Sequence, residues 1–356
     1  MLGIIATPGR PGGERLGELE EPTLGEHHLL LRTLALGVCG TDREILRGGY
    51  GWAPPGRDWM VLGHESLGLV AQAPPSGSGS DFAEGDLVAG IVRRPDPVPC
   101  LCCARGEFDL CRDGGYRERG IKELDGYGAE LVALEPEYAV KLDPSLGLLG
   151  ILTEPTSIVA KAWERIDRIG RQACAPPASV LITGAGPIGL LAALLGTQRG
   201  LNVHVLDRAR EGPKPELVGL LGASYHSGKV ADACRSGEPD VVIECSGAPE
   251  LMIEAVRNTA PDAVVCLLGV ATGARTLGVD VGALNNELVL ENDVVFGSVN
   301  ANRRHFVAAG EALAVADPEW LARLITRRVP LNEWTRAFET PGTEIKAVID
   351  FGEDIH

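Results

Sequence analysis

The chain has 356 residues, 45% of them hydrophobic and 23% charged, which is enough for two domains that each bury a core. Its formal net charge of −16 argues against a nucleic acid or an anionic membrane as partner, and no apolar run approaches the roughly 20 residues that a membrane span requires. The first residues lack a basic segment that leads into an apolar core, so we expect no signal peptide and a cytoplasmic protein.

The first 150 residues are rich in glycine and proline, and short apolar runs alternate there with turn signals. Runs such as 27–38 and 127–142 are typical of short strands, which predicts a barrel-like β domain.

Two apolar stretches of this region carry side chains of the types that serve as metal ligands. Cys39 lies between Gly37 and Gly40 in "GVCGTD", and His64 and Glu65 are adjacent in "VLGHESLGLV". Burying a charged group without a partner is costly, which favours a functional role. A cysteine, a histidine and a carboxylate suit a catalytic zinc ion with one position open. Taken alone, Cys39 would be a core residue and His64 a buried histidine with its hydrogen bonds satisfied.

A cysteine cluster follows. Four of the nine cysteines fall within residues 100–111, in "CLCCARGEFDLC". An odd total with one tight cluster and no secretory signal indicates a reducing compartment and metal binding, not a disulfide framework.

The pattern changes near Ile151. Residues 153–170 have apolar side chains at helical spacing and end in Gly170, which is typical of a helix C-cap. An apolar strand, a glycine turn, a long apolar helix and a second strand follow over 178–208. Further apolar runs alternate with helical segments, which predicts a parallel sheet with helices on both faces.

The last stretch predicts a helix pair and a closing strand that return to the first domain. We therefore expect one domain at 1–158, completed by 300–356, and a second at 159–299.

The glycine turn reads G-x-G-x-x-G, with Pro187 and Ile188 between the last two glycines. It follows a predicted strand and opens a predicted helix, the context of a dinucleotide-binding site. There Gly184 permits the tight turn, Gly186 lets the backbone approach a pyrophosphate, and Gly189 allows close packing of helix on strand. The helix N-terminus then faces the phosphates.

The second strand ends at Asp207, 18 residues after Gly189. A carboxylate there accepts hydrogen bonds from a ribose and repels a 2′-phosphate, which favours NAD. Arg208 and Arg210 follow, and arginines in this loop suit the 2′-phosphate of NADP. They are equally consistent with solvated loop charges, so we predict NAD, with NADP as the alternative.

In this order, "GVCGTD", "GHE", the cysteine cluster and the glycine turn resemble the zinc-containing medium-chain alcohol dehydrogenases over essentially the whole chain. The resemblance implies an α/β protein with a GroES-like β-barrel catalytic domain and a Rossmann domain with a doubly wound parallel sheet. It implies that Cys39 and His64 bind a catalytic zinc ion, and that Glu65 and Glu154 either bind it or exchange with water. Thr41 matches the hydroxyl that relays the substrate proton.

The cysteine cluster resembles the family's structural-zinc lobe, which is spaced C-x2-C-x2-C-x7-C. Cys100, Cys103 and Cys111 match the last three cysteines, but the first position is Pro97. The resemblance implies a second, structural zinc ion, although a lobe without metal stays open. Three nearby residues could supply the fourth ligand: Asp96, Cys102 and Asp113.

The segments "IVRRPDP", "YRERGIKELDGYGAELV" and "GSVNANRRHF" resemble the glucose 1-dehydrogenase branch of this family. That resemblance implies oxidation of an aldose, D-glucose at C1 to the lactone, with Glu118, Glu154, Asn300 and His305 holding the sugar. It also implies a homo-oligomer, a dimer or a tetramer. The alternatives are a polyol, amino-sugar or threonine-type zinc dehydrogenase, and a nucleotide-binding relative without catalysis.

Overall fold

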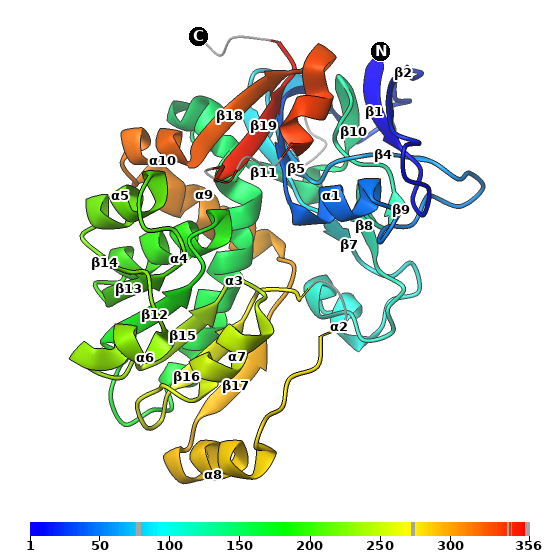
Figure 1. The fold of residues 1–356 in the computed structure, drawn as a ribbon. Helices are drawn as coiled ribbons and strands as arrows, with labels where there is room; N and C mark the ends of the chain where they lie inside the picture. The colour runs from blue at the N-terminus through cyan, green and yellow to red at the C-terminus, as the bar shows by residue number, and fades with distance from the viewer. Residues whose placement is uncertain (76–79, 272–274, 340–341, 343, 353–356) are drawn as a thin grey trace. The chain divides into compact units, whose positions relative to one another are not determined.

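The computed structural model describes residues 1–75, 80–271, 275–339, 342 and 344–352. They form two compact units, one of residues 1–157 with 300–356 and one of residues 158–299. Most of their helices and strands are labelled in Figure 1. None of the helices in the described ranges is long and apolar enough to cross a membrane.

The first unit is built on a seven-stranded sheet in which chain segments far apart in sequence are neighbours. Its central strand β3 is ten residues long and pairs antiparallel with β5, β10 and the C-terminal strand β19. The strands, in spatial order, are β11 (Ala139–Lys141), β6 (Leu87–Gly90), β5 (Glu65–Gln72), β3 (Leu29–Val38), β19 (Lys346–Asp350) and β18 (Ile325–Pro330), with β10 (Leu131–Leu134) beside β3. The expected closing strand is therefore β19, and it returns to the sheet that carries the metal-binding motifs.

Two small sheets complete the strands of this unit. They are β2 (Arg15–Glu18), β1 (Leu2–Ala6) and β4 (Met60–Val61), and β7 (Arg93–Arg94), β8 (Arg117–Arg119) and β9 (Glu123–Leu124). Its helices are α1 (Gly40–Leu46), α2 (Leu101–Ala104), α9 (Arg303–Ala314) and α10 (Pro318–Leu324), with 3-10 turns at η1 (Phe108–Leu110), η2 (Pro136–Tyr138), η3 (Pro144–Leu152) and η5 (Leu331–Phe338). The long helix α3 (Thr153–Gly170) begins here and continues into the second unit.

The second unit is a six-stranded sheet in which every neighbouring pair is parallel. The strands, in spatial order, are β14 (Ser224–His226), β13 (Asn202–Leu206), β12 (Ser179–Thr183), β15 (Val241–Glu244), β16 (Val264–Leu267) and β17 (Val294–Gly297). The connecting helices are α4 (Pro187–Gln198), α5 (Pro213–Leu220), α6 (Val230–Ala233), followed by the turn η4 (Cys234–Ser236), α7 (Pro249–Val256) and α8 (Val281–Glu291).

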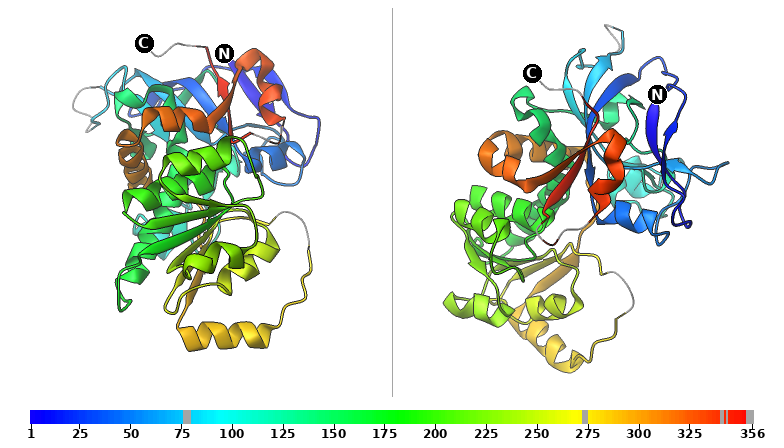
Figure 2. Two further views of the ribbon diagram at one scale, coloured as in Figure 1. Left: turned by 60° about the vertical axis from the view of Figure 1, so that its left-hand side comes forward. Right: turned by 45° about the horizontal axis from the view of Figure 1, so that its top comes forward.

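Successive side chains point to opposite faces of a sheet, and the inner strands β12, β15 and β16 are buried on both faces. Leu181 of β12 packs with residues of α6 and α7, while its neighbour Val180 lies on the opposite face near Gly196 of α4 and Trp163 of α3. The two layers of helices are visible in Figure 2. The α/β fold expected from the alternating pattern is confirmed.

Candidate active site

Cys39 is fixed at the junction between strand β3 and helix α1. It is the N-cap of α1, and its sulfur accepts the backbone N–H of Thr41 at 3.3 Å. The carboxylate of Asp42 accepts a hydrogen bond from the N–H of Cys39 at 2.9 Å, which completes a capping box at the start of the helix. The motif "CGTD" therefore sets the position of the sulfur through local backbone geometry.

The β3–β5 ladder brings the second metal-binding motif beside the first. Glu65 at the start of β5 pairs with Gly37 of β3. A Cβ atom at Gly37 would lie 2.1 Å from a carboxylate oxygen of Glu65, so this position has to be glycine while the carboxylate keeps its place. His64 then stands with its Nε2 atom 3.1 Å from the sulfur of Cys39.

Asp42 also controls His64. One oxygen of its carboxylate lies 3.1 Å from Nδ1 of the imidazole, and both side chains are buried. A carboxylate beside Nδ1 favours a proton on that nitrogen, and Nε2 is the nitrogen that faces Cys39, the arrangement that outer carboxylates give to metal-binding histidines. Burial alone would lower the pKa of His64, but Asp42 and Cys39 raise it well above its ordinary value, so the site attracts positive charge.

Glu65 has a buried cationic partner. The ammonium group of Lys346, on β19, forms an ion pair with Glu65 and donates to the carbonyl of Val38 at 3.2 Å. Both side chains of the pair are almost completely buried. Burial would lower the pKa of Lys346, but the Glu65 carboxylate raises it, so the lysine stays charged.

Glu154 lies in the first turn of α3 and is buried. Burial, with repulsion from Glu65, raises the pKa of Glu154 to about 7. Its carboxylate is outside the group of ligand atoms within 4.8 Å of one another, which comes from Cys39, His64 and Glu65. A thiol, an imidazole nitrogen and a carboxylate in anionic surroundings fit a zinc ion.

The cysteine lobe brings three sulfur atoms together. Those of Cys100, Cys103 and Cys111 lie within 4.8 Å of one another, and Cys100 accepts the N–H of Arg112 at 3.4 Å. Backbone N–H groups, that of Arg112 foremost, lower the pKa of Cys100 to about 6, while burial raises that of Cys103 to about 11. None of the three residues that could supply a fourth ligand joins this group: Asp96, Cys102 and Asp113. The three thiols fit three of the four ligands that a structural zinc ion takes.

Besides Glu154, the residues expected to hold a sugar divide into two sets. Glu118 on β8 and Asn300, 182 positions later, are buried and in contact, because the Asn300 amide donates to Glu118 Oε1. His305 is buried in the first turn of α9, where its Nδ1 accepts the N–H of Asn302 at 2.9 Å and caps the helix. The geometry thus gives His305 a helix-capping function and leaves its Nδ1 unable to accept from a ligand.

The glycine turn has the backbone form that its sequence predicts. Gly184 has a φ of +91°, and a Cβ atom at Gly189 would lie 1.8 Å from the carbonyl oxygen of Gly184. A Cβ atom at Gly186 would meet no atom within 4 Å, so this glycine borders open space as an approach by a ligand requires. It is the N-cap of α4, whose first residues are Pro187 and Ile188.

Asp207 is held by the glycine turn itself. Its carboxylate accepts the N–H of Ala185 at 2.7 Å and that of Ala209 at 3.1 Å, and Lys214 of α5 lies 3.3 Å from it. Burial would raise the pKa of Asp207, but these donors lower it. Arg208 is exposed. The basic partner of Asp207 is therefore Lys214, and not one of the arginines that follow Asp207 in the sequence.

Three residues of the site were not predicted from the sequence: Asp42, Arg93 and Lys346. Asp42 had a local signal, since an acid three residues after a capping residue is the capping-box pattern. Lys346 and Arg93 had none, because each acts on a partner that is distant in the sequence.

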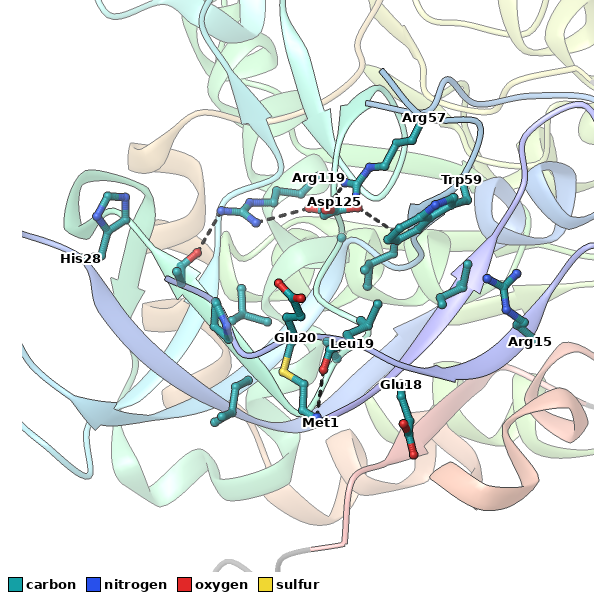
Figure 3. Close-up of a pocket in the computed structure, with 18 of the residues that line it drawn as sticks. Met1, Arg15, Glu18, Leu19, Glu20, His28, Arg57, Trp59, Arg119 and Asp125 are labelled. Carbon is teal, nitrogen blue, oxygen red and sulfur yellow. Dashed lines mark hydrogen bonds and ion pairs between the residues drawn. The ribbon is translucent and has the colours of Figure 1, made fainter. Parts of the chain in front are cut away.

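A cavity of about 720 Å³ lies elsewhere in the first unit. Its wall includes Arg57, Trp59, Arg119 and Asp125, shown in Figure 3, and does not include Cys39, His64 or Glu118. Arg57 forms an ion pair with Asp125 and stacks over Trp59 at 4.2 Å. Arg57 and Asp125 therefore neutralise each other within the wall, which favours a structural function for this pair.

Both parts of the chain match known families. Residues 25–144 match the alcohol dehydrogenase GroES-like domain, and residues 147–351 match the glucose dehydrogenase C-terminus. With the parallel sheet and the Cys–His–Glu cluster, these matches define a zinc-type medium-chain dehydrogenase.

Relatives narrow the class. The chain is 40% identical over 358 residues to a glucose 1-dehydrogenase of Thermoproteus tenax, covering 98% of this chain and 99% of the relative. It is 36% identical over 363 residues to one of Methanocella arvoryzae, covering 99% and 100%. A glucose dehydrogenase of Haloferax mediterranei, solved in complex with NADP, Zn and gluconolactone, superposes with a TM-score of 0.91 at 34% identity, covering 99% of this chain and all of that one. The chain belongs to the glucose 1-dehydrogenase family.

Proposed function

We propose that the chain oxidises D-glucose at C1 to the lactone, with zinc at the Cys39–His64 cluster and NAD or NADP as hydride acceptor. The observation that carries the proposal is the 3.1 Å approach of Cys39 to His64, with Asp42 behind the imidazole. The Haloferax relative with NADP, Zn and gluconolactone supports the same substrate class.

Cys39 and His64 would hold the catalytic zinc ion, with Glu65, Glu154 or water completing its ligands. Bound there, zinc supplies a Lewis acid that lowers the pKa of the C1 hydroxyl. Asp42 keeps the imidazole in the tautomer that binds metal. Lys346 compensates the charge of Glu65 in a buried position, and the raised pKa of Glu154 lets that carboxyl carry a proton near neutral pH.

The proton of the C1 hydroxyl needs a route out of a buried site. Thr41 follows Cys39 by two residues, and its side chain makes no hydrogen bond within the part of the chain that the structure describes. We assign its hydroxyl to the proton relay.

Glu118 and Asn300 would bind hydroxyl groups of the sugar ring. A buried carboxylate and a buried amide suit a ligand that offers several hydroxyls, because a simple alkanol would leave them unpaired. His305, whose Nδ1 caps α9, is a third residue that we propose to lie at the sugar-binding site.

The second unit would bind the dinucleotide at Gly184, Gly186 and Gly189, with the pyrophosphate at the start of α4. Asp207 would accept a ribose hydroxyl, which favours NAD. The neighbouring Lys214 offsets part of the acid's charge, so NADP is the second acceptor that we expect.

The cysteine lobe would hold a structural zinc ion through Cys100, Cys103 and Cys111, with water or another small ligand in the fourth position. All nine cysteines are free thiols, which supports a reducing compartment, and we assign the chain to the cytoplasm.

A second copy of the chain would cover α8 and β17. On these elements Val289, Leu290, Val294 and Val295 are exposed, and β17 is an edge of the six-stranded sheet. Proteins usually protect an unpaired edge strand, so an edge that is both unpaired and apolar marks a surface for association. We infer a homo-oligomer, and sedimentation of wild type beside Leu290→Glu tests it; an unchanged monomer mass for both would refute it.

The decisive experiment is a substrate panel. NAD(P)H formation is followed with aldoses, linear polyols, amino sugars and threonine, separately with NAD and NADP. Oxidation of glucose to a lactone supports the proposal. Turnover of polyols, amino sugars or threonine alone would replace the substrate and keep the zinc dehydrogenase, and coenzyme binding without turnover on zinc-loaded protein would indicate a non-catalytic relative.

A further inference from the structure

Two adjacent arginines on β7 have similar surroundings and different partners. Arg93 and Arg94 are both buried, and each stacks on a tyrosine ring, Arg93 on Tyr116 at 3.7 Å and Arg94 on Tyr138 at 3.8 Å. Successive side chains of a strand point to opposite faces. Arg93 therefore reaches Glu118, while Arg94 donates to the carbonyl of Ile91 at 2.6 Å.

Arg93 donates from two nitrogens to a single oxygen of Glu118. Its Nε lies 3.0 Å and its Nη2 2.9 Å from Oε1, and the amide of Asn300 donates to the same atom. Oε2 makes no hydrogen bond within the described residues, and it is not among the polar atoms there that are fully buried without a partner. The carboxylate is thus held by one oxygen, and the other is an acceptor that solvent or a ligand reaches.

The third nitrogen of Arg93 ties it to the cysteine lobe. Its Nη1 donates to the carbonyl of Asp109 at 3.1 Å, and a carboxylate oxygen of Asp109 accepts from Asn302 at 2.8 Å. The guanidinium plane is therefore fixed at all three nitrogens. A lysine would keep the charge but not this planar set of donors.

We propose that Arg93 is a positioning residue that holds Glu118 so that Oε2 faces a sugar hydroxyl, and that this orientation sets the discrimination among aldoses. The inference rests on the proposed sugar-binding function of Glu118. It adds a residue that does not itself touch the sugar.

The test compares Arg93→Lys with the matched control Arg94→Lys, both at strand β7 and both retaining charge. A misplaced carboxylate loses a hydrogen bond to a charged partner, about 1.5–3 kcal/mol, which corresponds to roughly 10- to 150-fold in kcat/KM. We expect Arg93→Lys to show that loss for glucose mainly as a raised KM. The ratio of kcat/KM for glucose to kcat/KM for its epimers should fall. Arg94→Lys should leave both quantities within about 3-fold of wild type.

A double-mutant cycle with Glu118→Gln separates an effect through Glu118 from a general disturbance of the fold. If Arg93 acts through Glu118, Arg93→Lys should change KM by less than about 3-fold in the Glu118→Gln background. Losses that multiply in the double variant, or equal losses in Arg93→Lys and Arg94→Lys, would overturn the inference while the proposed function stands. If Arg93→Lys is not obtained folded, Arg93→Gln is judged by the same criteria. A wild type that oxidises no aldose would end the proposed function and this inference together.

Discussion

The buried pair of Lys346 and Glu65 allows a prediction whose size follows from its burial. Replacing Lys346 by methionine keeps much of the side-chain volume and removes the only ionic partner that the described residues give Glu65. Both side chains are no more than 3% exposed, so water cannot replace the lysine. Leaving one member of such a pair uncompensated costs about 3–5 kcal/mol, a large share of the 5–15 kcal/mol by which a domain is typically stable.

The measurement is urea unfolding of metal-free protein, because a divalent cation beside Glu65 would take over the function of the lysine. Tryptophan fluorescence reports chiefly on the first unit, which contains Trp52, Trp59, Trp320 and Trp334, while the second contains only Trp163. We expect Lys346→Met to lower the free energy of unfolding by about 3–5 kcal/mol at pH 7.

The control removes both charges. Lys346→Met combined with Glu65→Gln leaves no uncompensated charge, and it should lie within about 1–2 kcal/mol of wild type. A loss below about 1 kcal/mol in the single variant would mean that Glu65 is solvated or protonated there, and would refute the assignment of the lysine as its partner.

Three further predictions concern other parts of the site. Because the folded state raises the pKa of Glu154 from 4.5 to about 7, it resists ionisation of this group, and metal-free protein should lose about 3 kcal/mol of stability as the pH rises from about 4.5 to 7; Glu154→Gln should flatten that slope in urea titrations at several pH values, and an equal slope in both proteins would contradict it. Metal analysis should find two zinc ions per wild-type chain and one in Cys103→Ser, whereas one in wild type would mean that three sulfurs do not retain metal. Asp207→Ala should raise the ratio of kcat/KM for NADP to that for NAD, because it removes a charge that repels a 2′-phosphate and frees Lys214; an unchanged ratio would show that the acid does not face the ribose.

Features that depend on residues close together in the sequence were predictable from it. The glycine turn is one, since Gly184 and Gly189 are required by a backbone that closes on itself over six residues. The cap formed by Cys39 and Asp42 is another, although only its cysteine was recognised. The alternation of strands and helices likewise predicted the parallel sheet, because two parallel neighbours need a crossover connection, usually a helix. The near-continuous apolar strands fit a sheet that helices cover on both faces.

What the tertiary structure alone decided is the set of charged partners at the site. Lys346 reaches Glu65 only because β19 pairs with β3, and Asn300 reaches Glu118 across 182 residues. The sequence pointed to Cys39 and His64 as metal ligands, and its resemblance to the family pointed to Glu118 as a sugar-binding residue, but neither indicated which groups compensate or orient these side chains. Local spacing limits which backbone a segment can form, whereas the neighbours of a buried charge depend on which distant segments pack around it, and that follows from the whole fold.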